Sequence, residues 1–175
     1  MIPRKITARE LMTPGVSTCR PEDTLRSAAL IMRERHCGCM PVVAEDDRPV
    51  AMLTDRDVCL AAYKRDAPLS TLYVREAMSK AIYTCKPDDS LVVAERMMRE
   101  HKVRRLAIVD RDARLVGLLS LSDIAREAAR DHVAATRDAS ADGLTQTLAA
   151  VSETEPSPPP PRATPHAPTS GGGHR

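Results

Sequence analysis

The chain contains an internal repeat: residues 9–60 align with residues 75–126 at a constant offset of 66 positions, without a gap. The two stretches are identical at 18 of 52 positions, and many other pairs exchange similar side chains. A duplication of this size indicates two copies of one supersecondary unit. Because a unit of about 60 residues buries little surface by itself, we expect the two copies to pack against each other.

Each copy opens with a short extended piece and a helix. The extended pieces are predicted over residues 15–19 and 81–85. We expect the first helix of each copy to begin at its proline, Pro21 or Pro87, because proline suits the first turn and the two acids after it would face the positive end of the helix dipole. Apolar residues then recur at helical spacing from Leu25 to Met32, and again from Leu91 to Met98.

Two strands and a second helix follow in each copy. Polar turns at residues 45–48 and 111–114 separate apolar segments of strand length. The strands are predicted over Met40–Ala44 and Pro49–Thr54, and over Arg105–Asp110 and Leu115–Ser120, with second helices that start at Asp55 and Leu121. The repeated unit is therefore strand, helix, strand, strand, helix, which predicts an α/β (α+β) fold.

Composition divides the chain into four parts. The copies occupy residues 7–66 and 70–130, and a partly helical linker is predicted over residues 131–152. Of the 14 prolines, seven fall between Pro156 and Pro168. Such a segment cannot bury enough apolar surface to offset its ordering entropy, so residues 153–175 are predicted to be a disordered Pro/Gly-rich tail.

Composition also argues against several classes of protein. The chain has 26 basic and 24 acidic residues, no Phe, no Trp and three Tyr. It lacks both the basic surface and the stacking platform that nucleic-acid binding uses. It has no apolar run long enough to cross a membrane and no visible signal segment. Five cysteines do not form a disulfide framework, so we expect a soluble, reduced, cytoplasmic protein.

The pattern resembles a tandem pair of CBS domains, a type named for the regulatory region of cystathionine beta-synthase. The resemblance covers about residues 7–130. It rests on the duplication, on Cys39-Met40-Pro41-Val42-Val43, and on strands that run into Thr54-x-x-Asp57 and Ser120-x-x-Asp123. It implies a pseudo-twofold disc with two clefts, stacked as a homodimer. It also implies a non-catalytic regulatory module that binds AMP, ADP, ATP or S-adenosylmethionine in a cleft.

The resemblance assigns roles to the residues at the start of each second helix. The hydroxyls of Thr54 and Ser120 would hold a phosphate, and Asp57 and Asp123 would bind a ribose diol. These residue types suit the task, because a hydroxyl beside the free N–H groups of a helix N-terminus attracts anions. A carboxylate also offers several acceptor sites to the two ribose hydroxyls.

The resemblance extends to the walls of the clefts and to two arginines. Segments Val16–Thr18 and Ile82–Thr84 resemble the wall that holds adenine, and Arg104 and Arg105 resemble residues that reach a phosphate. At the positions of Arg104 and Arg105 the first copy has no cation, which suggests one good cleft. The ligand-binding set implied is Val16, Thr18, Met40, Pro41, Thr54, Arg56, Asp57, Ile82, Thr84, Arg104, Arg105, Ala107, Ser120 and Asp123.

The same residues allow other interpretations. Ser/Thr-x-x-Asp at a helix start is close to a capping box, so these residues could be helix caps and nothing more. Cys37 and Cys39 flank a glycine near Arg35 and His36, which can lower the pKa of a thiol. They are therefore candidates for a redox pair. No metal site is predicted, since a second cluster of Cys or His ligands is missing.

Three functions remain open at this stage. The first is the adenosine-binding sensor, the second a ligand-free dimerising interaction module, and the third a cysteine-based redox sensor in a stress response. No glycine-rich phosphate loop or catalytic set is visible, so we predict that the protein is not an enzyme and needs no cofactor. The expected partners are an adenine nucleotide, a second copy and an unidentified protein, with neither membrane nor nucleic acid.

Overall fold

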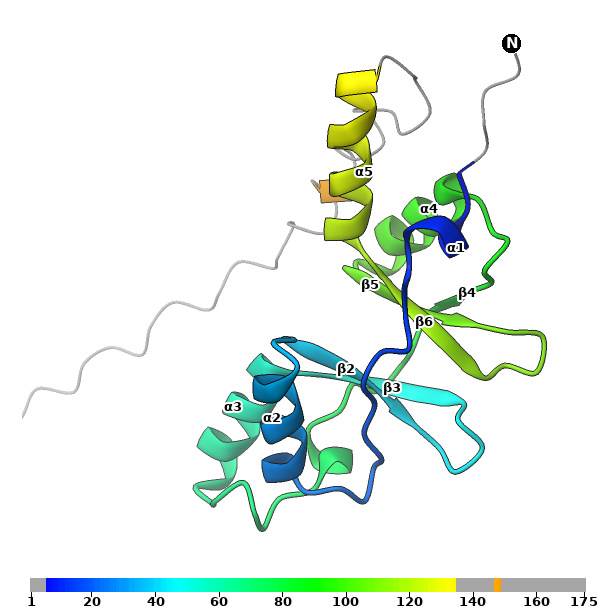
Figure 1. Cartoon of the computed structure of the whole chain (residues 1–175). Helices are drawn as coiled ribbons and strands as arrows, with labels where there is room; N and C mark the ends of the chain where they lie inside the picture. Colours follow the sequence, from blue (N-terminus) through cyan, green and yellow to red (C-terminus); the bar gives the residue numbers. More distant parts are fainter. Residues whose placement is uncertain (1–5, 135–146, 149–175) are drawn as a thin grey trace, which may run out of the picture.

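The computed structural model describes residues 6–134 and 147–148. The predicted linker over residues 131–152 and the tail over residues 153–175 lie outside this part, apart from residues 131–134 and 147–148. Figure 1 shows helices α2 and α3 at one end of the molecule and α1, α4 and α5 at the other, with the strands of both halves between them.

The repeat produces corresponding helices and the same hairpin twice, and the predicted α/β class is confirmed. The short strands β1 and β4 do not stand at repeat-equivalent positions. Strands β3 and β6 and the starts of helices α3 and α5 have the predicted bounds. The first half contains α1 (Ala8–Leu11), β1 (Thr13–Pro14), α2 (Leu25–Glu34), β2 (Cys39–Val43), β3 (Pro49–Thr54) and α3 (Asp55–Arg65). The second contains the 3-10 helix η1 (Val74–Glu76), β4 (Thr84–Cys85), α4 (Leu91–His101), β5 (Arg105–Val109), β6 (Leu115–Ser120) and α5 (Leu121–Ala134).

The prediction that a helix begins at Pro21 is wrong. Helix α2 begins at Leu25, and the side chain of its N-cap residue Thr24 accepts a hydrogen bond from a backbone N–H of the first turn. The carboxylate of Asp23 accepts a hydrogen bond of 2.7 Å from the N–H of Arg20 and so closes the turn before the helix. The second copy makes the same turn, and α4 begins at Leu91, so the predicted start at Pro87 is wrong as well. Asp23 is therefore used by a turn rather than by the helix dipole.

The strands form two sheets. One has four strands in the order β1-β6-β5-β4, and the other is the hairpin β2-β3. The two hairpins, β2-β3 and β5-β6, are antiparallel and share an irregularity of register at equivalent positions, Val42/Val43 and Ile108/Val109. The pseudo-symmetry of the sequence thus extends to details of strand pairing.

The two copies exchange their opening segments. Strand β1 of the first copy pairs with β6 of the second, and Thr7 forms an antiparallel bridge with Ser90. The exchange is reciprocal, because Tyr73 and Thr24, the repeat-equivalents of Thr7 and Ser90, form the same bridge. Each half is therefore completed by residues from the other copy.

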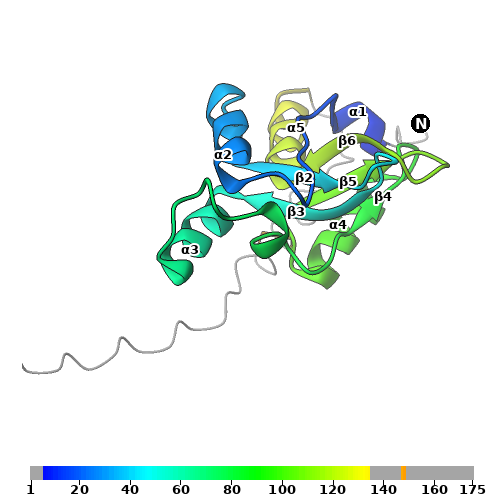
Figure 2. The ribbon, with the colours of Figure 1, turned by 90° about the horizontal axis from the view of Figure 1, so that it is seen from below.

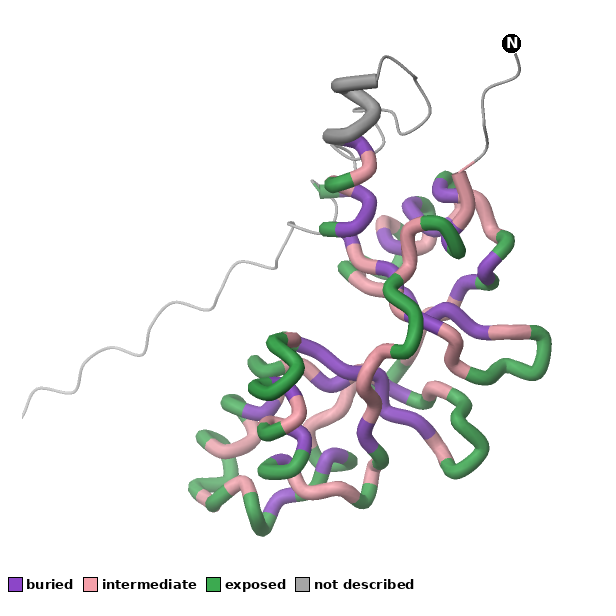
Figure 3. Tube along the Cα trace, in the orientation of Figure 1, coloured by how far each residue is buried: buried purple, intermediate pink, exposed green. Residues whose placement is uncertain are grey.

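The two hydrophobic cores reflect this exchange. The first core contains residues of α2, β2 and β3 together with Leu72 and Val74 from the opening of the second copy. The second core contains residues of α4, β5, β6 and α5 together with Ala8 from α1. Figure 3 shows the buried residues running along the strands, with exposed residues on the outer turns and helices.

Gly117 makes room for β1 beside β6, where it is paired with Pro14. A Cβ atom at this position would lie 2.9 Å from the carbonyl oxygen of Thr13 and 2.8 Å from the sulfur of Met12. Real Cβ atoms essentially never come this close to other heavy atoms. Only glycine therefore allows the opening segment to lie directly on the strand.

Figure 2, a view from below, again shows the strands of both halves near the centre, with helices around them. Within the described residues, no helix is long and apolar enough to cross a bilayer.

Candidate functional site

Strands β3 and β6 each present one face to a core and the other to a cleft. In β3, Ala51 and Leu53 are fully buried, whereas Met52 and Thr54 are half-buried. Side chains alternate along a strand, so Met52 and Thr54 share the face that points away from the core. The last residue of that face, Thr54, is also the N-cap of α3.

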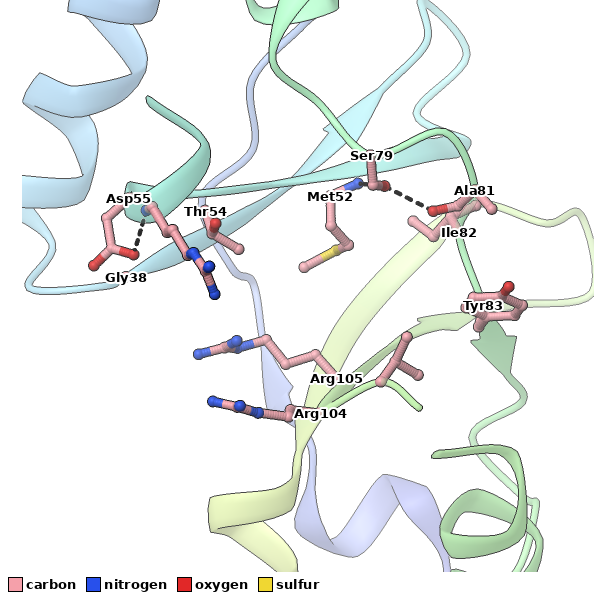
Figure 4. A pocket seen from close by; sticks show the side chains of 12 residues that line it. Gly38, Met52, Thr54, Asp55, Ser79, Ala81, Ile82, Tyr83, Arg104 and Arg105 are labelled. Atoms are coloured by element: carbon pink, nitrogen blue, oxygen red, sulfur yellow. Dashed lines mark hydrogen bonds between the residues drawn. The ribbon is translucent and has the colours of Figure 1, made fainter. Parts of the chain in front are cut away.

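The first cleft, called cleft A here, has a volume of about 490 Å³. The end of β3 and the start of α3 form one side, and the opening segment of the second copy and the start of β5 form the other (Figure 4). Its lining residues are Gly38, Met52, Thr54, Asp55, Arg56, Ser79, Ala81, Ile82, Tyr83, Val103, Arg104 and Arg105.

The second cleft, called cleft B, has a volume of about 460 Å³. Its lining residues are Thr13, Gly15, Val16, Ser17, Arg35, Cys37, Gly38, Cys39, Arg105, Leu118, Ser120 and Asp123. Most of them stand 66 positions from a residue of cleft A; Val16 corresponds to Ile82 and Ser120 to Thr54. Each cleft therefore combines the wall of one copy with the hydroxyl of the other.

The Thr54-x-x-Asp57 and Ser120-x-x-Asp123 motifs form helix caps. Oδ2 of Asp57 accepts hydrogen bonds from the backbone N–H of Thr54 at 3.0 Å and from its hydroxyl at 2.6 Å. Asp123 does the same for Ser120, at 2.8 and 2.6 Å. The capping interpretation of these motifs is therefore confirmed, and any ligand contact must use the atoms that the caps leave over.

The two caps differ in those remaining atoms. Oδ1 of Asp123 accepts a hydrogen bond from Arg126 of the next helical turn, and Asp123 is 8% exposed. Oδ1 of Asp57 makes no hydrogen bond to any other described residue. Only Asp57 therefore keeps a carboxylate oxygen that can accept from a ligand hydroxyl.

Cleft A also carries more positive charge than cleft B. Arg104 and Arg105 extend side by side toward the part of the cleft where Thr54 lies (Figure 4). Neither arginine forms an ion pair within the described part of the chain, and Arg56 adds a third guanidinium. The N-terminus of α3 adds a partial positive charge. This combination suits an anion, and a phosphate in particular.

The two candidate redox cysteines lie in the wall of cleft B. Cys39 is 9% exposed and Cys37 is half-buried. Burial raises the pKa of the Cys39 thiol, and the nearby charge of Arg105 opposes this shift only in part. Since the thiolate is the reactive form, burial makes Cys39 a poor nucleophile at neutral pH.

Two further cysteines, Cys19 and Cys85, occupy equivalent positions of the repeat and lie in the two cores. Burial raises their pKa values to about 12 and about 11, respectively. Their positions are those of small packing residues.

The structure brings only part of the predicted set together. Thr54, Arg56, Ile82, Arg104 and Arg105 line cleft A, whereas Val16, Arg105, Ser120 and Asp123 line cleft B. Asp57 lines neither cleft and is placed by its bonds to Thr54. Thr18 lines a third hollow of about 330 Å³ between the two hairpin turns. Met40, Pro41 and Ala107 are fully buried in β2 and β5, and Thr84 pairs with Ala107. These last four residues hold the strands in place and present no surface to either cleft.

Sequence reasoning missed several lining residues of cleft A. Met52 was predictable, because it stands two positions before Thr54 on a strand and so shares its face. Ser79 had no such signal. Its hydroxyl accepts a hydrogen bond of 3.0 Å from the N–H of Met52 and donates one of 2.7 Å to the carbonyl of Ala81. These bonds fasten the wall of cleft A to β3 (Figure 4).

Among the described residues, no group of three or more His, Cys, Asp or Glu side chains is placed to hold a metal ion. Cys37 and Cys39 are therefore not joined by further ligands from that part of the chain.

The fold and its clefts define a class: a duplicated β-α-β-β-α unit with two clefts between the copies. Comparison with known proteins gives the class its name. The family model of the CBS domain matches residues 8–64 and 74–130, so the chain belongs to the CBS-domain family as a tandem pair. The resemblance predicted from the sequence is confirmed.

Hypoxic response protein 1 of Mycobacterium tuberculosis is a relative of similar size. It is 36% identical over 120 residues, which cover 69% of this chain and 83% of the relative. Its crystal structure, described as containing two coordinated zinc ions, superposes with a TM-score of 0.62 at 37% identity and covers 69% of this chain and 97% of that chain.

Two solved structures with lower identity share the fold. CBSX2, solved in complex with AMP and known from Arabidopsis thaliana, has a TM-score of 0.62 at 23% identity and covers 73% of this chain and 98% of its own. The CBS pair of MJ0100, solved with 5'-methylthioadenosine and S-adenosyl-L-methionine, has a TM-score of 0.65 at 19% identity. It covers 73% of this chain and 99% of its own.

Proposed function

We propose that this protein is a non-catalytic sensor module that binds an adenine nucleotide in cleft A. The observation that carries the proposal is that Arg104 and Arg105, which form no ion pair with any other described residue, face Thr54 across a cleft of about 490 Å³. A cleft of this volume is in the range that small-molecule sites occupy. The adenosine compounds bound by CBSX2 and by MJ0100 support a nucleoside ligand in this fold.

Each part of the nucleotide has a candidate partner in cleft A or directly beside it. Ile82 and Tyr83 offer an apolar wall to the base. Asp57 does not line the cleft, but it is bonded to the lining residue Thr54 and keeps Oδ1 for a ribose hydroxyl. The phosphate would lie against Arg104 and Arg105, because the guanidinium groups can donate to it whereas the hydroxyl proton of Thr54 is already donated to Asp57. Cleft B is the poorer match, because Asp123 has both carboxylate oxygens in use.

The charge of cleft A favours an anionic nucleotide over S-adenosylmethionine. Three guanidinium groups line the cleft, with Asp55 as the opposing carboxylate. AMP, ADP and ATP bring negative phosphates to these cations, whereas the sulfonium of S-adenosylmethionine adds another positive charge. Charge-assisted hydrogen bonds to phosphate are about twice as strong as neutral ones, so we expect ADP or ATP to bind more tightly than S-adenosylmethionine.

Isothermal titration of the full chain with AMP, ADP, ATP and S-adenosylmethionine tests the proposal. Arg104→Ala should weaken ADP binding by about tenfold or more, which corresponds to one hydrogen bond to a charged group. Arg26→Ala is the matched control, because Arg26 is an exposed arginine of α2 that lines neither cleft. No binding of any of the four compounds would favour a ligand-free interaction module instead.

We further propose that two copies associate through α2 and α3. These helices expose Leu30, Leu60 and Tyr63, at 45%, 40% and 84%. The positions equivalent to Leu30 and Leu60 in the second copy are Arg96 and Arg126. The first half therefore has an apolar outer face where the second half has a charged one, and exposed apolar residues that cluster favour association.

A further inference from the structure

Clefts A and B are separated by a shared wall. Two residues, Arg105 and Gly38, line both of them. Gly38 has no side chain, so Arg105 is the one charged side chain, among the lining residues above, that can reach an anion in either cleft.

The duplication explains why this wall carries a single cation. The repeat-equivalent of Arg105 is Cys39, and the two side chains lie close enough for the charge of Arg105 to act on the thiol. A symmetric pair would place two cations, or none, at this position. Here one guanidinium serves both clefts.

The cations that remain differ between the two sides. Without Arg105, cleft A still has Arg56 and Arg104, whereas cleft B has only Arg35, together with the carboxylate of Asp123. A guanidinium carries one positive charge, and its planar fork binds one phosphate in a bidentate manner. A phosphate on one side therefore removes the main cation from the other side and adds negative charge close to it.

We propose that Arg105 makes the two clefts compete for nucleotide phosphate, so that a nucleotide in cleft A lowers the affinity of cleft B. This inference rests on the proposed function and adds regulation to the same sites. Because coupling between two sites is reciprocal, a nucleotide in cleft B weakens cleft A to the same degree. Over a wide range of concentration the chain then holds one nucleotide rather than two.

Titration of the full chain with ADP, together with two variants at equivalent positions, tests the competition. Ile82→Trp fills cleft A and so isolates cleft B, whereas Val16→Trp fills cleft B and isolates cleft A. We expect the wild type to show a strong first step and a weak second step. The Ile82→Trp variant should bind ADP in cleft B about tenfold or more tightly than the wild type binds its second ADP. A factor of this size is in the usual range for coupled sites.

A third variant identifies the cause. With Arg105→Gln as background, Ile82→Trp should bind ADP no more tightly than the second step of Arg105→Gln alone, because the shared cation is gone. Met52→Trp and Leu118→Trp provide a second pair of blocking variants at equivalent positions of the two clefts. Far-UV circular dichroism identifies the variants that fold, and only these are titrated.

The outcomes separate this inference from the proposed function. Equal affinities for Ile82→Trp and for the second step of the wild type would mean independent clefts, which overturns the competition alone. A wild type that binds one ADP and an Ile82→Trp variant that binds none would also overturn it, since cleft B would then not be a site. A folded wild type that binds no ADP overturns the proposed function, and the competition with it.

Discussion

The hydroxyl of Thr54 donates a hydrogen bond of 2.6 Å to Oδ2 of Asp57. This bond closes the cap of α3 and fixes the carboxylate of Asp57 beside Thr54, which lines cleft A. The cap therefore adjoins the proposed site, and a variant of either residue changes stability and binding together unless the change is chosen to separate them.

Asp57→Asn and Asp57→Ala separate the two roles. Asn keeps an oxygen that can accept from the backbone N–H of Thr54, so the melting temperature should stay near that of the wild type. Ala removes the Asp57 half of the capping box and should cost about 1 kcal/mol of unfolding free energy. Both variants should bind ADP several-fold more weakly by titration calorimetry, because the free carboxylate oxygen is lost. Wild-type affinity in Asp57→Asn would mean that Asp57 does not contact the ribose.

Gly117→Ala should destabilise the second half of the molecule. The new Cβ would lie 2.9 Å from the carbonyl oxygen of Thr13, and overpacking of this kind typically costs about 1–3 kcal/mol. Urea denaturation followed by circular dichroism measures the cost. Leu118→Ala is a control on the same strand, since it removes atoms without pressing on β1. An unchanged midpoint for Gly117→Ala would show that β1 can lift off β6 without loss.

Glu95 on α4 predicts a dependence of stability on pH. Its side chain is 6% exposed, and Oε1 has no hydrogen-bond partner among the described residues. Burial raises the pKa of this carboxyl above its ordinary value of 4.5, with Arg99 acting in the opposite direction. The folded form thus favours the protonated acid, so this contribution to stability is present below pH 4.5 and is lost as the pH rises through the folded-state pKa.

Glu95→Gln should remove that part of the pH dependence and raise the melting temperature at pH 8 more than at pH 4.5. Glu100→Gln is the matched control, because Glu100 lies on the same helix with its side chain 59% exposed. Melting curves at several pH values make the comparison. Parallel curves for wild type and Glu95→Gln would mean that the pKa of Glu95 is the same in the folded and unfolded chains.

The exposed apolar residues of α2 and α3 allow a test of the proposed association of two copies. Leu60→Glu and Tyr63→Glu should shift the protein from dimer to monomer in multi-angle light scattering at micromolar concentration, because each places a charge in an apolar contact. Arg96→Glu changes the equivalent helix pair of the second half and should leave the dimer intact. A wild type that is monomeric under these conditions would contradict the association itself.

Local patterns in the sequence predicted the elements well. The alternation of β3 and β6, and the caps that begin α3 and α5, are set by neighbouring residues, so their positions follow from spacing alone. The start of α2 was wrong, because Asp23 can satisfy either a helix end or a turn, and the choice depends on where Arg20 lies. Residues with two equivalent uses are poorly predicted without their surroundings.

The candidate site was only partly predictable for a related reason. The offset of 66 positions makes Thr54 equivalent to Ser120 and Ile82 equivalent to Val16. It does not predict which wall faces which hydroxyl. The exchange of opening segments places the wall of the second copy opposite Thr54, and that exchange depends on long-range pairing such as the Thr7–Ser90 bridge. Met40, Pro41 and Ala107 were chosen by resemblance, yet all three are fully buried within their strands and line neither cleft. Met40 packs in the first core, whereas Pro41 and Ala107 belong to neither core.

The exchange of opening segments also sets an order of events during synthesis on the ribosome. The first core needs nothing beyond Met78 and can close early. Helix α1 leaves the ribosome before the other described elements, but Arg9 meets its partner Asp88 only 79 positions later. At about 5–20 residues per second, that wait lasts roughly 4 to 16 seconds. During it the apolar side chains of Ile6, Leu11 and Met12 have no core to enter, and a chaperone has its best opportunity to bind the nascent chain.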